Sequence, residues 1–169
     1  AATKEPRPAG RGLTGRTLGL IGFTEDAQKL AELAQTLGMA VFVCADDLTT
    51  TLSSEAGVRL AADVDDVFRR ADVVSVHARC GTGEPVASAA RLDLLSGGIL
   101  IDTTGGDGLD LAAVRERAAA GTLRVGVDGV DISEGEGALL AAVDGVIALP
   151  GIANRTDQAD DTAAAAVVA

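Results

Sequence analysis

The side chains best placed to do chemistry in this sequence lie in a turn that starts at Gly22. A dinucleotide-binding turn reads G-x-G-x-x-G, because bare backbone must approach a pyrophosphate at the N-terminus of the following helix. Here the three glycine positions hold Gly22, Thr24 and Ala27. Glu25 and Asp26 fill the two positions between the last pair, where two phosphate groups would lie. The turn therefore predicts a nucleotide-binding fold whose nucleotide chemistry is weakened or replaced.

Acidic and hydroxyl side chains also follow several of the apolar runs that we expect to be strands. Ligands of doubly wound sheets bind at the carboxyl ends of the strands, so these side chains are candidates for a site. The candidates for catalysis are Asp102, Thr103, Thr104, Asp128 and Asp131, and those for cofactor binding are Gly22, Thr24 and Asp46. The same edge is expected to hold Glu25, Asp26, Cys80 and Asp107.

Four interpretations of this acidic edge stay open. It is a solvated rim with some helix caps, a residual NAD(H) site that uses Gly22 and Asp46, a site for a hard cation, or an acid–base site whose crowded carboxylates have raised pKa values. The sequence holds no Walker A, CxxC or HExxH pattern, and we assign no metal ligands. The only histidine, His77, is expected at the end of a strand in a structural role.

The elements that must position these residues alternate along the chain. Short β-branched runs predict strands at 17–22, 40–45, 72–77, 98–103, 123–130 and 145–149, with a very short one near 58–61. Helical spacing and caps predict helices at 25–37, 63–70, 87–95 and 110–121, and a last one from 154 to 166. This alternation is typical of a parallel α/β sheet.

Composition narrows the class of protein. Apolar residues make up 47% of the chain and aromatic residues 2%, so the core must be built from Ala, Val, Leu and Ile. A formal net charge of −11 argues against nucleic acid or an anionic membrane as partner. No apolar run is long enough to span a membrane and no export signal is visible; with Cys44 and Cys80 far apart, this favours the cytoplasm.

Several short sequence motifs, in their order along the chain, resemble those of the nucleotide-binding domain of the D-isomer-specific 2-hydroxyacid dehydrogenases. The matching motifs lie at residues 13–23, 37–41, 71–77, 100–104, 121–130 and 146–150. The resemblance implies a doubly wound, Rossmann-type α/β domain in three layers, with a mostly parallel sheet of six or seven strands. It also implies NAD as the family's cofactor and a homodimer formed through this domain. The family's separate substrate domain has no counterpart in the sequence.

The departures from the family pattern concern its catalytic groups. The resemblance puts Gly105 where the family has its catalytic arginine, and Gly151 where it has the histidine that acts as general acid. Asp131 and Glu134 are the nearest residues to the supporting glutamate. Asp46 lies within one residue of the position of the ribose-binding aspartate.

We therefore expect a basic leader at 1–16 and a single Rossmann-like domain at 17–169. The expected function is that of a stand-alone pseudoenzyme, a binding or scaffold module for an unknown protein or small molecule, with no tightly bound cofactor and at most weak NAD binding. The alternatives are an enzyme of another class that uses the acidic and threonine rim, and an NAD(H)-binding oxidoreductase domain.

Overall fold

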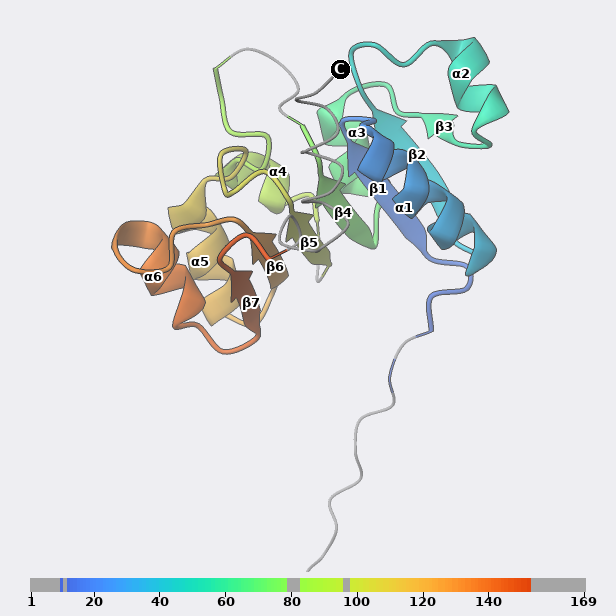
Figure 1. The fold of residues 1–169 in the computed structure, drawn as a ribbon. Helices are drawn as coiled ribbons and strands as arrows, with labels where there is room; N and C mark the ends of the chain where they lie inside the picture. The colour runs from blue at the N-terminus through green and yellow to red at the C-terminus, as the bar shows by residue number, and fades with distance from the viewer. Residues whose placement is uncertain (1–9, 11, 79–82, 96–97, 153–169) are drawn as a thin grey trace, which may run out of the picture.

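A computed structural model describes residues 10, 12–78, 83–95 and 98–152 of the chain. Its centre is a seven-stranded parallel sheet in the order β3-β2-β1-β4-β5-β6-β7, shown in Figure 1. The strands are β1 (Thr17–Ile21), β2 (Ala40–Cys44), β3 (Arg59–Leu60), β4 (Val73–Val76), β5 (Ile99–Asp102), β6 (Arg124–Asp128) and β7 (Val146–Leu149). This order is that of a doubly wound sheet, and the predicted Rossmann-type fold is confirmed.

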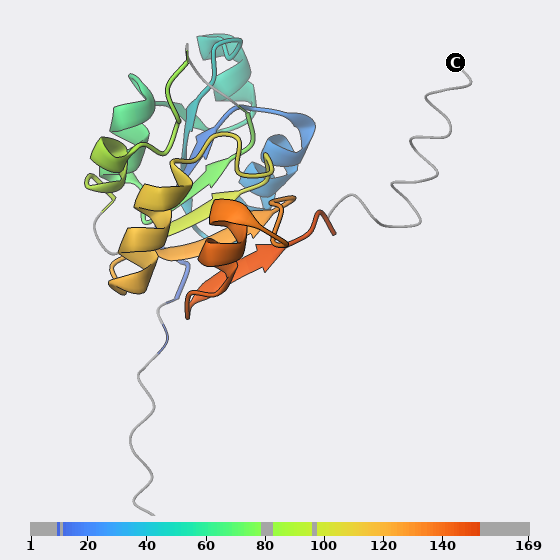
Figure 2. The same cartoon turned by 90° about the vertical axis from the view of Figure 1, so that its left-hand side faces the viewer.

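Helices connect successive strands and form the outer layers. They are α1 (Glu25–Thr36), α2 (Thr50–Glu55), α3 (Val64–Arg70), α4 (Ala89–Leu92), α5 (Leu111–Ala119) and α6 (Gly135–Ala141). In Figure 2, the gold α5 and the orange α6 lie side by side over the half of the sheet that ends in β7. None of these helices has both the length and the apolar character that a membrane span needs, within the part of the chain that the structure describes.

Two separate cores hold the layers together. On one face, the alanines of α1 at 27, 31 and 34 pack with Leu18 and Leu20 of β1. On the opposite face, side chains of α3, α5 and α6, among them Phe68, Val114 and Leu140, pack against β4, β5 and β6. Aliphatic and alanine side chains fill most of both cores, as the low aromatic content predicts.

The helix boundaries follow from capping side chains. Thr24 begins α1, Asp63 begins α3 and Asp110 begins α5, and each side chain accepts a hydrogen bond from the backbone N–H three residues on. Gly38, with a φ of +80°, follows the end of α1 and supplies the left-handed backbone that stops a helix there. These starts agree with the capping signals in the sequence.

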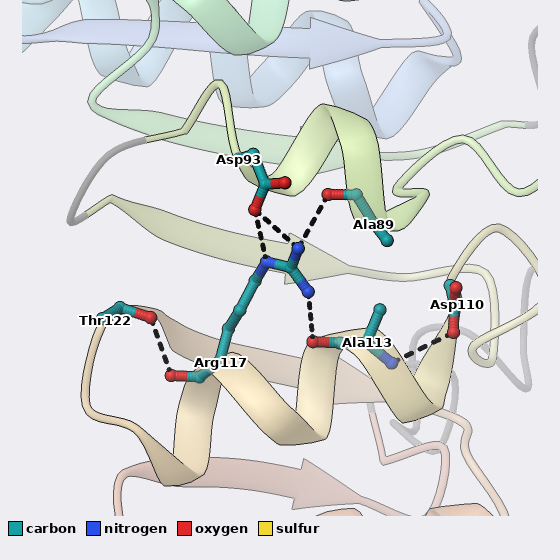
Figure 3. Close-up of polar contacts among 6 residues, drawn as sticks. All are labelled: Ala89, Asp93, Asp110, Ala113, Arg117 and Thr122. Atoms are coloured by element: carbon teal, nitrogen blue, oxygen red, sulfur yellow. Dashed lines mark hydrogen bonds and ion pairs between the residues drawn. The ribbon is translucent and has the colours of Figure 1, made fainter.

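An arginine fixes α5 against α4 (Figure 3). Arg117 donates from Nε and Nη2 to Asp93 at 3.1 and 2.6 Å, and from Nη2 to the carbonyl of Ala89 at 2.9 Å. Its Nη1 donates to the carbonyl of Ala113 within α5. The guanidinium thus satisfies a carbonyl of the single-turn helix α4 and joins it to α5.

Some predicted elements differ from the observed ones. Two helices, α2 and α6, were not predicted. The helix predicted at 87–95 is wrong in extent, because Ala87 is held extended in a bridge to Leu109 and the helix covers only Ala89–Leu92. The predicted helix at 154–166, and Cys80, which was expected at the same edge as the acidic candidates, lie outside the described residues.

Candidate functional site

The turn after β1 is shaped by Gly22. This glycine has a φ of +84°, and a β-carbon there would lie 2.5 Å from the β-carbon and 2.8 Å from the backbone nitrogen of Ala78. The carbonyl of Ile21, just before the turn, accepts from the backbone N–H groups of His77 and Ala78. Gly22 therefore lets the end of β1 approach the end of β4 closely, at the point where strand order reverses and nucleotides bind in such sheets.

The helix N-terminus that follows the turn is occupied by its own side chains. Thr24 is the N-cap of α1, and its Oγ1 accepts from the backbone N–H of Ala27 at 3.4 Å. Glu25 and Asp26 are exposed in the first turn of the helix. Because carboxylates interact favourably with the positive end of a helix dipole, these groups satisfy the electrostatic role that a bound phosphate would have.

A small open pocket lies beside this turn. It has a volume of about 170 Å³ and is lined by Gly22, Phe23, Thr24, Ala45, Asp46, Asp47 and Ala78. Ligand pockets of drug-sized molecules have roughly 300–1,000 Å³, so this one is small. The structure thus brings together the three residues proposed for cofactor binding, and it adds Asp47 and Ala78, which sequence reasoning did not select. Asp47 directly follows Asp46, and the run of two acids was the signal available for it.

Asp102, the last residue of β5, has no exposed surface. Its Oδ1 accepts from the hydroxyl of Thr104 at 2.6 Å, and its Oδ2 accepts from the backbone N–H groups of Thr104 and Gly106 at 3.2 and 2.7 Å. Burial raises the pKa of this carboxyl above its ordinary value, and the hydrogen bonds from Thr104 and Gly106 oppose that rise. The carboxylate organises the turn after β5 from within, out of reach of solvent.

His77 lies in a chain of hydroxyl contacts beside that turn. Its Nε2 is 2.9 Å from Oγ of the buried Ser75, and its Nδ1 is 3.4 Å from Oγ1 of Thr103, which donates to the carbonyl of Val76. Burial lowers the pKa of the imidazole, while the charges of Asp26 and Asp102 act in the opposite direction. Both ring nitrogens are engaged with protein groups, which fits the structural role predicted for His77.

The remaining acidic candidates also cap turns. Asp128 ends β6, and its Oδ1 accepts from the backbone N–H of Ile152 at 3.0 Å. Asp131 accepts from the backbone N–H and the hydroxyl of Ser133 at 2.8 and 2.6 Å, and these bonds lower the pKa of its carboxyl. Among the described residues, no group of three or more His, Cys, Asp or Glu side chains is arranged to hold a metal ion.

Three loops meet at glycines beyond the ends of β5, β6 and β7. Gly105, Gly129 and Gly151 all have positive φ, at +77°, +87° and +77°. A β-carbon at Gly105 would lie 3.3 Å from the carbonyl oxygen of Gly129, and one at Gly151 would lie 3.7 Å from the α-carbon of Gly129. The two positions that the resemblance matches to the family's catalytic side chains therefore both lie close to the backbone of Gly129, a residue that sequence reasoning did not select.

The family model of the D-isomer specific 2-hydroxyacid dehydrogenase NAD binding domain matches residues 2–153. The chain belongs to this family. The (S)-sulfolactate dehydrogenase of Chromohalobacter salexigens is 36% identical over 92% of the chain, and the hydroxypyruvate reductase of Thermotoga maritima is 29% identical over 89% of it. The chain covers 52% and 50% of these two relatives, so it spans about half the length of each.

Solved structures show the same fold. The D-lactate dehydrogenase of Aquifex aeolicus, complexed with NAD and lactic acid, superposes with a TM-score of 0.83 at 24% identity, over 99% of this chain and 56% of that one. The TT0316 protein of Thermus thermophilus gives a TM-score of 0.78 at 26% identity, over 95% of this chain and 51% of that one. The predicted resemblance to the family is confirmed.

Proposed function

We propose that this domain is a member of the dehydrogenase family that transfers no hydride and acts as a binding or scaffold module. The observation that carries the proposal is the backbone contact between the loops of Gly105 and Gly129. Reduction of a keto acid needs a cation to orient the carboxylate and an acid to protonate the oxygen. The resemblance assigns these two roles to the positions of Gly105 and Gly151, and a glycine supplies neither group.

Among the described residues, neither Asp102 nor His77 is placed to take over these roles. Asp102 is fully buried, and its two oxygens accept three hydrogen bonds from the turn. His77 is in contact with hydroxyl groups through both ring nitrogens. An enzyme of another class that used Asp102 as its acid would need substrate to reach a carboxyl group without exposed surface, so this alternative has little support.

The cofactor site fits NAD only in part. When bound, NAD supplies the hydride acceptor of the family's reaction. Asp46 lies beside Gly22 in the pocket and can accept from a ribose hydroxyl. At the pyrophosphate position, however, the Thr24 hydroxyl accepts from the helix N-terminus, and Glu25 and Asp26 add negative charge. We infer weak NAD(H) binding. Because the pocket between β1 and β2 is retained, an NAD(H)-binding oxidoreductase domain is the second candidate.

A steady-state assay tests the absence of hydride transfer. The chain is mixed with NADH and, in turn, pyruvate, glyoxylate and hydroxypyruvate, and oxidation of NADH is followed. We expect turnover far below about 1 per second, the low end of ordinary enzymes. The Thermotoga maritima hydroxypyruvate reductase serves as the positive control. Turnover by this chain above about 1 per second with any of the three acids would show that the proposal is wrong.

The setting and the assembly of the domain are part of the same proposal. We place it in the cytoplasm, because two cysteines as far apart in the sequence as Cys44 and Cys80 suggest a reducing setting, and we infer a homodimer from the family resemblance. Light scattering at several protein concentrations tests the assembly, and a monomer at all of them would contradict it.

A further inference from the structure

The imidazole of His77 is attached to the backbone that forms one wall of the pocket. His77 directly follows β4, and its backbone N–H and that of Ala78 donate to the carbonyl of Ile21 at 2.8 and 3.2 Å. Ala78 and Gly22 both line the pocket, and a β-carbon on Gly22 would lie 2.5 Å from that of Ala78. The charge of His77 is therefore set one residue away from the place where a nucleotide would bind.

The hydrogen bonds around the ring assign its proton. Oγ1 of Thr103 donates its only proton to the carbonyl of Val76 at 3.1 Å, so it accepts from Nδ1 of His77, 3.4 Å away. The neutral ring then has its proton on Nδ1, and Nε2 accepts from the hydroxyl of the buried Ser75 at 2.9 Å. Nε2 is therefore the atom that takes up a second proton, and the Ser75 hydroxyl must then turn and accept.

Two carboxylates act on this ring from neighbouring elements. Burial lowers the pKa of His77, and the charges of Asp26 in the first turn of α1 and of Asp102 at the end of β5 oppose that change. Asp102 is buried and accepts from the N–H groups of its own turn. Asp26 is exposed, so it is the one of the two that a bound ligand can approach.

Asp26 lies at a position where a dinucleotide would place a phosphate. In the G-x-G-x-x-G pattern, it is one of the two residues between the last pair of glycine positions, at the N-terminus of the helix that follows. The negative charge of Asp26 already makes His77 easier to protonate. A phosphate at the same helix N-terminus brings charge of the same sign to the same region, so it acts on the ring in the same direction.

We propose that the pocket binds a nucleotide pyrophosphate together with a proton, which His77 accepts from solvent at Nε2. The imidazolium then offsets part of the negative charge that Glu25 and Asp26 bring to the phosphate position. His77 acts through its charge and forms no bond with the ligand, so it regulates binding and is not a catalytic residue. This inference rests on the weak nucleotide binding proposed above, and it does not depend on the proposed absence of hydride transfer.

The linkage between proton and ligand sets the sign of the pH dependence. A bound phosphate raises the pKa of His77, and by reciprocity protonation of His77 strengthens nucleotide binding by the same factor. The pKa of the ring without ligand lies below 6.5, and affinity should be highest below that value. Affinity should fall as pH rises through the pKa of the ring with ligand bound, above which the ring is neutral in both states.

Proton NMR of the unmodified chain tests the linkage directly. The ring signals of His77 are titrated with acid without ligand, with ADP-ribose and with adenosine. ADP-ribose has the pyrophosphate of NAD but no terminal phosphate, which would itself titrate at about pH 6. ADP-ribose should raise the midpoint by about half a pH unit or more, equivalent to about threefold in affinity, and adenosine should not. An unchanged midpoint, an equal rise with adenosine, or no effect of ADP-ribose on the spectrum at any pH would overturn the proposal.

Calorimetric titration with ADP-ribose at about pH 5 and about pH 8 provides a second test. The ratio of the two affinities should be at least about threefold larger in the wild type than in His77→Gln, because only the wild type gains the imidazolium. Glu32→Gln, at an exposed position of α1, is the matched control and should keep the ratio of the wild type. Equal ratios in the wild type and His77→Gln would overturn the proposal. Hydride transfer in the steady-state assay would overturn the proposed function alone, so the two failures are distinguishable.

Discussion

The α-carbon of Gly105 lies against the backbone of Gly129, so close that a β-carbon on residue 105 would be 3.3 Å from the Gly129 carbonyl oxygen. Both residues have φ values that favour glycine, +77° and +87°. The loops after β5 and β6 are therefore packed backbone to backbone. In this chain, the backbone at Gly105, the position that the resemblance matches to the family's arginine, favours a residue without a side chain.

Restoring the family's arginine should destabilise this domain. In Gly105→Arg, the left-handed backbone costs roughly 1–2 kcal/mol and the contact with Gly129 adds to it. Urea unfolding should show a loss of at least about 1 kcal/mol, without gain of hydride transfer. Gly145→Arg is the matched control, because Gly145 has a φ of +86° and a β-carbon there would meet no atom within 4 Å. If Gly105→Arg were no more destabilising than Gly145→Arg, the backbone contact would have no energetic weight.

Asp102 should make the folded chain less stable as pH rises, whereas a carboxyl group with a lowered pKa has the opposite effect. Burial raises the pKa of Asp102 in the folded chain above the ordinary 3.8, so the folded state binds this proton more tightly than the unfolded state. The free energy of unfolding due to this group is then largest below pH 3.8 and decreases as pH rises through the raised pKa.

The measurement compares the free energy of unfolding of the wild type with that of Asp102→Asn at a series of pH values. The wild type should lose stability relative to the variant as pH rises from 3.8. Asp131→Asn gives a control of opposite sign, because hydrogen bonds from Ser133 lower the pKa of Asp131 and its contribution is lost as pH falls. A free energy of unfolding of the wild type that rises with pH relative to that of Asp102→Asn would contradict the assigned burial.

Much of the fold was predictable because its signals are local. Apolar β-branched runs marked six strands, and a very short run near 58–61 marked the seventh, β3. Capping residues such as Asp63 and Asp110 marked helix starts. The helices α2 and α6 carry weak local signals: the first is rich in Ser and Thr, and the second contains Gly135 and Gly137. In α6, where Gly137 and Leu140 are buried, tertiary packing selects helix against propensity.

The site was only partly predictable. Gly22 and Thr24 follow β1 and Asp46 follows β2, so they form one pocket because these two strands are neighbours in the sheet. The order of the family's sequence motifs indicated this arrangement of strands. The burial of Asp102 was not predictable, because it depends on a turn whose N–H groups fold back onto the carboxylate. The meeting of Gly105 and Gly129 joins loops of different strands, and no sequence pattern marks such a contact.

The imidazole of His77 should titrate below its ordinary pKa of 6.5, because burial disfavours the charged ring. His77 is the only histidine in the sequence, so its ring signals in a proton NMR titration can be assigned without a variant that lacks it. Since the folded state resists protonation, stability should also fall as pH drops below 6.5. In Asp26→Asn the midpoint should fall further, because the Asp26 charge raises this pKa. A midpoint at or above 6.5 in the wild type would be the opposite result.

The central claim is that the turn at Thr24 to Asp26 disfavours the pyrophosphate, and calorimetric titration with NADH tests it most directly. The wild type is compared with a Thr24→Gly, Glu25→Arg, Asp26→Ile variant, and Glu32→Arg on the exposed side of α1 controls for charge alone. The triple variant should gain roughly tenfold or more in affinity, because two repulsive charges near the phosphates are removed, whereas Glu32→Arg should not. Low-micromolar binding by the wild type, with no gain in the triple variant, would contradict the account.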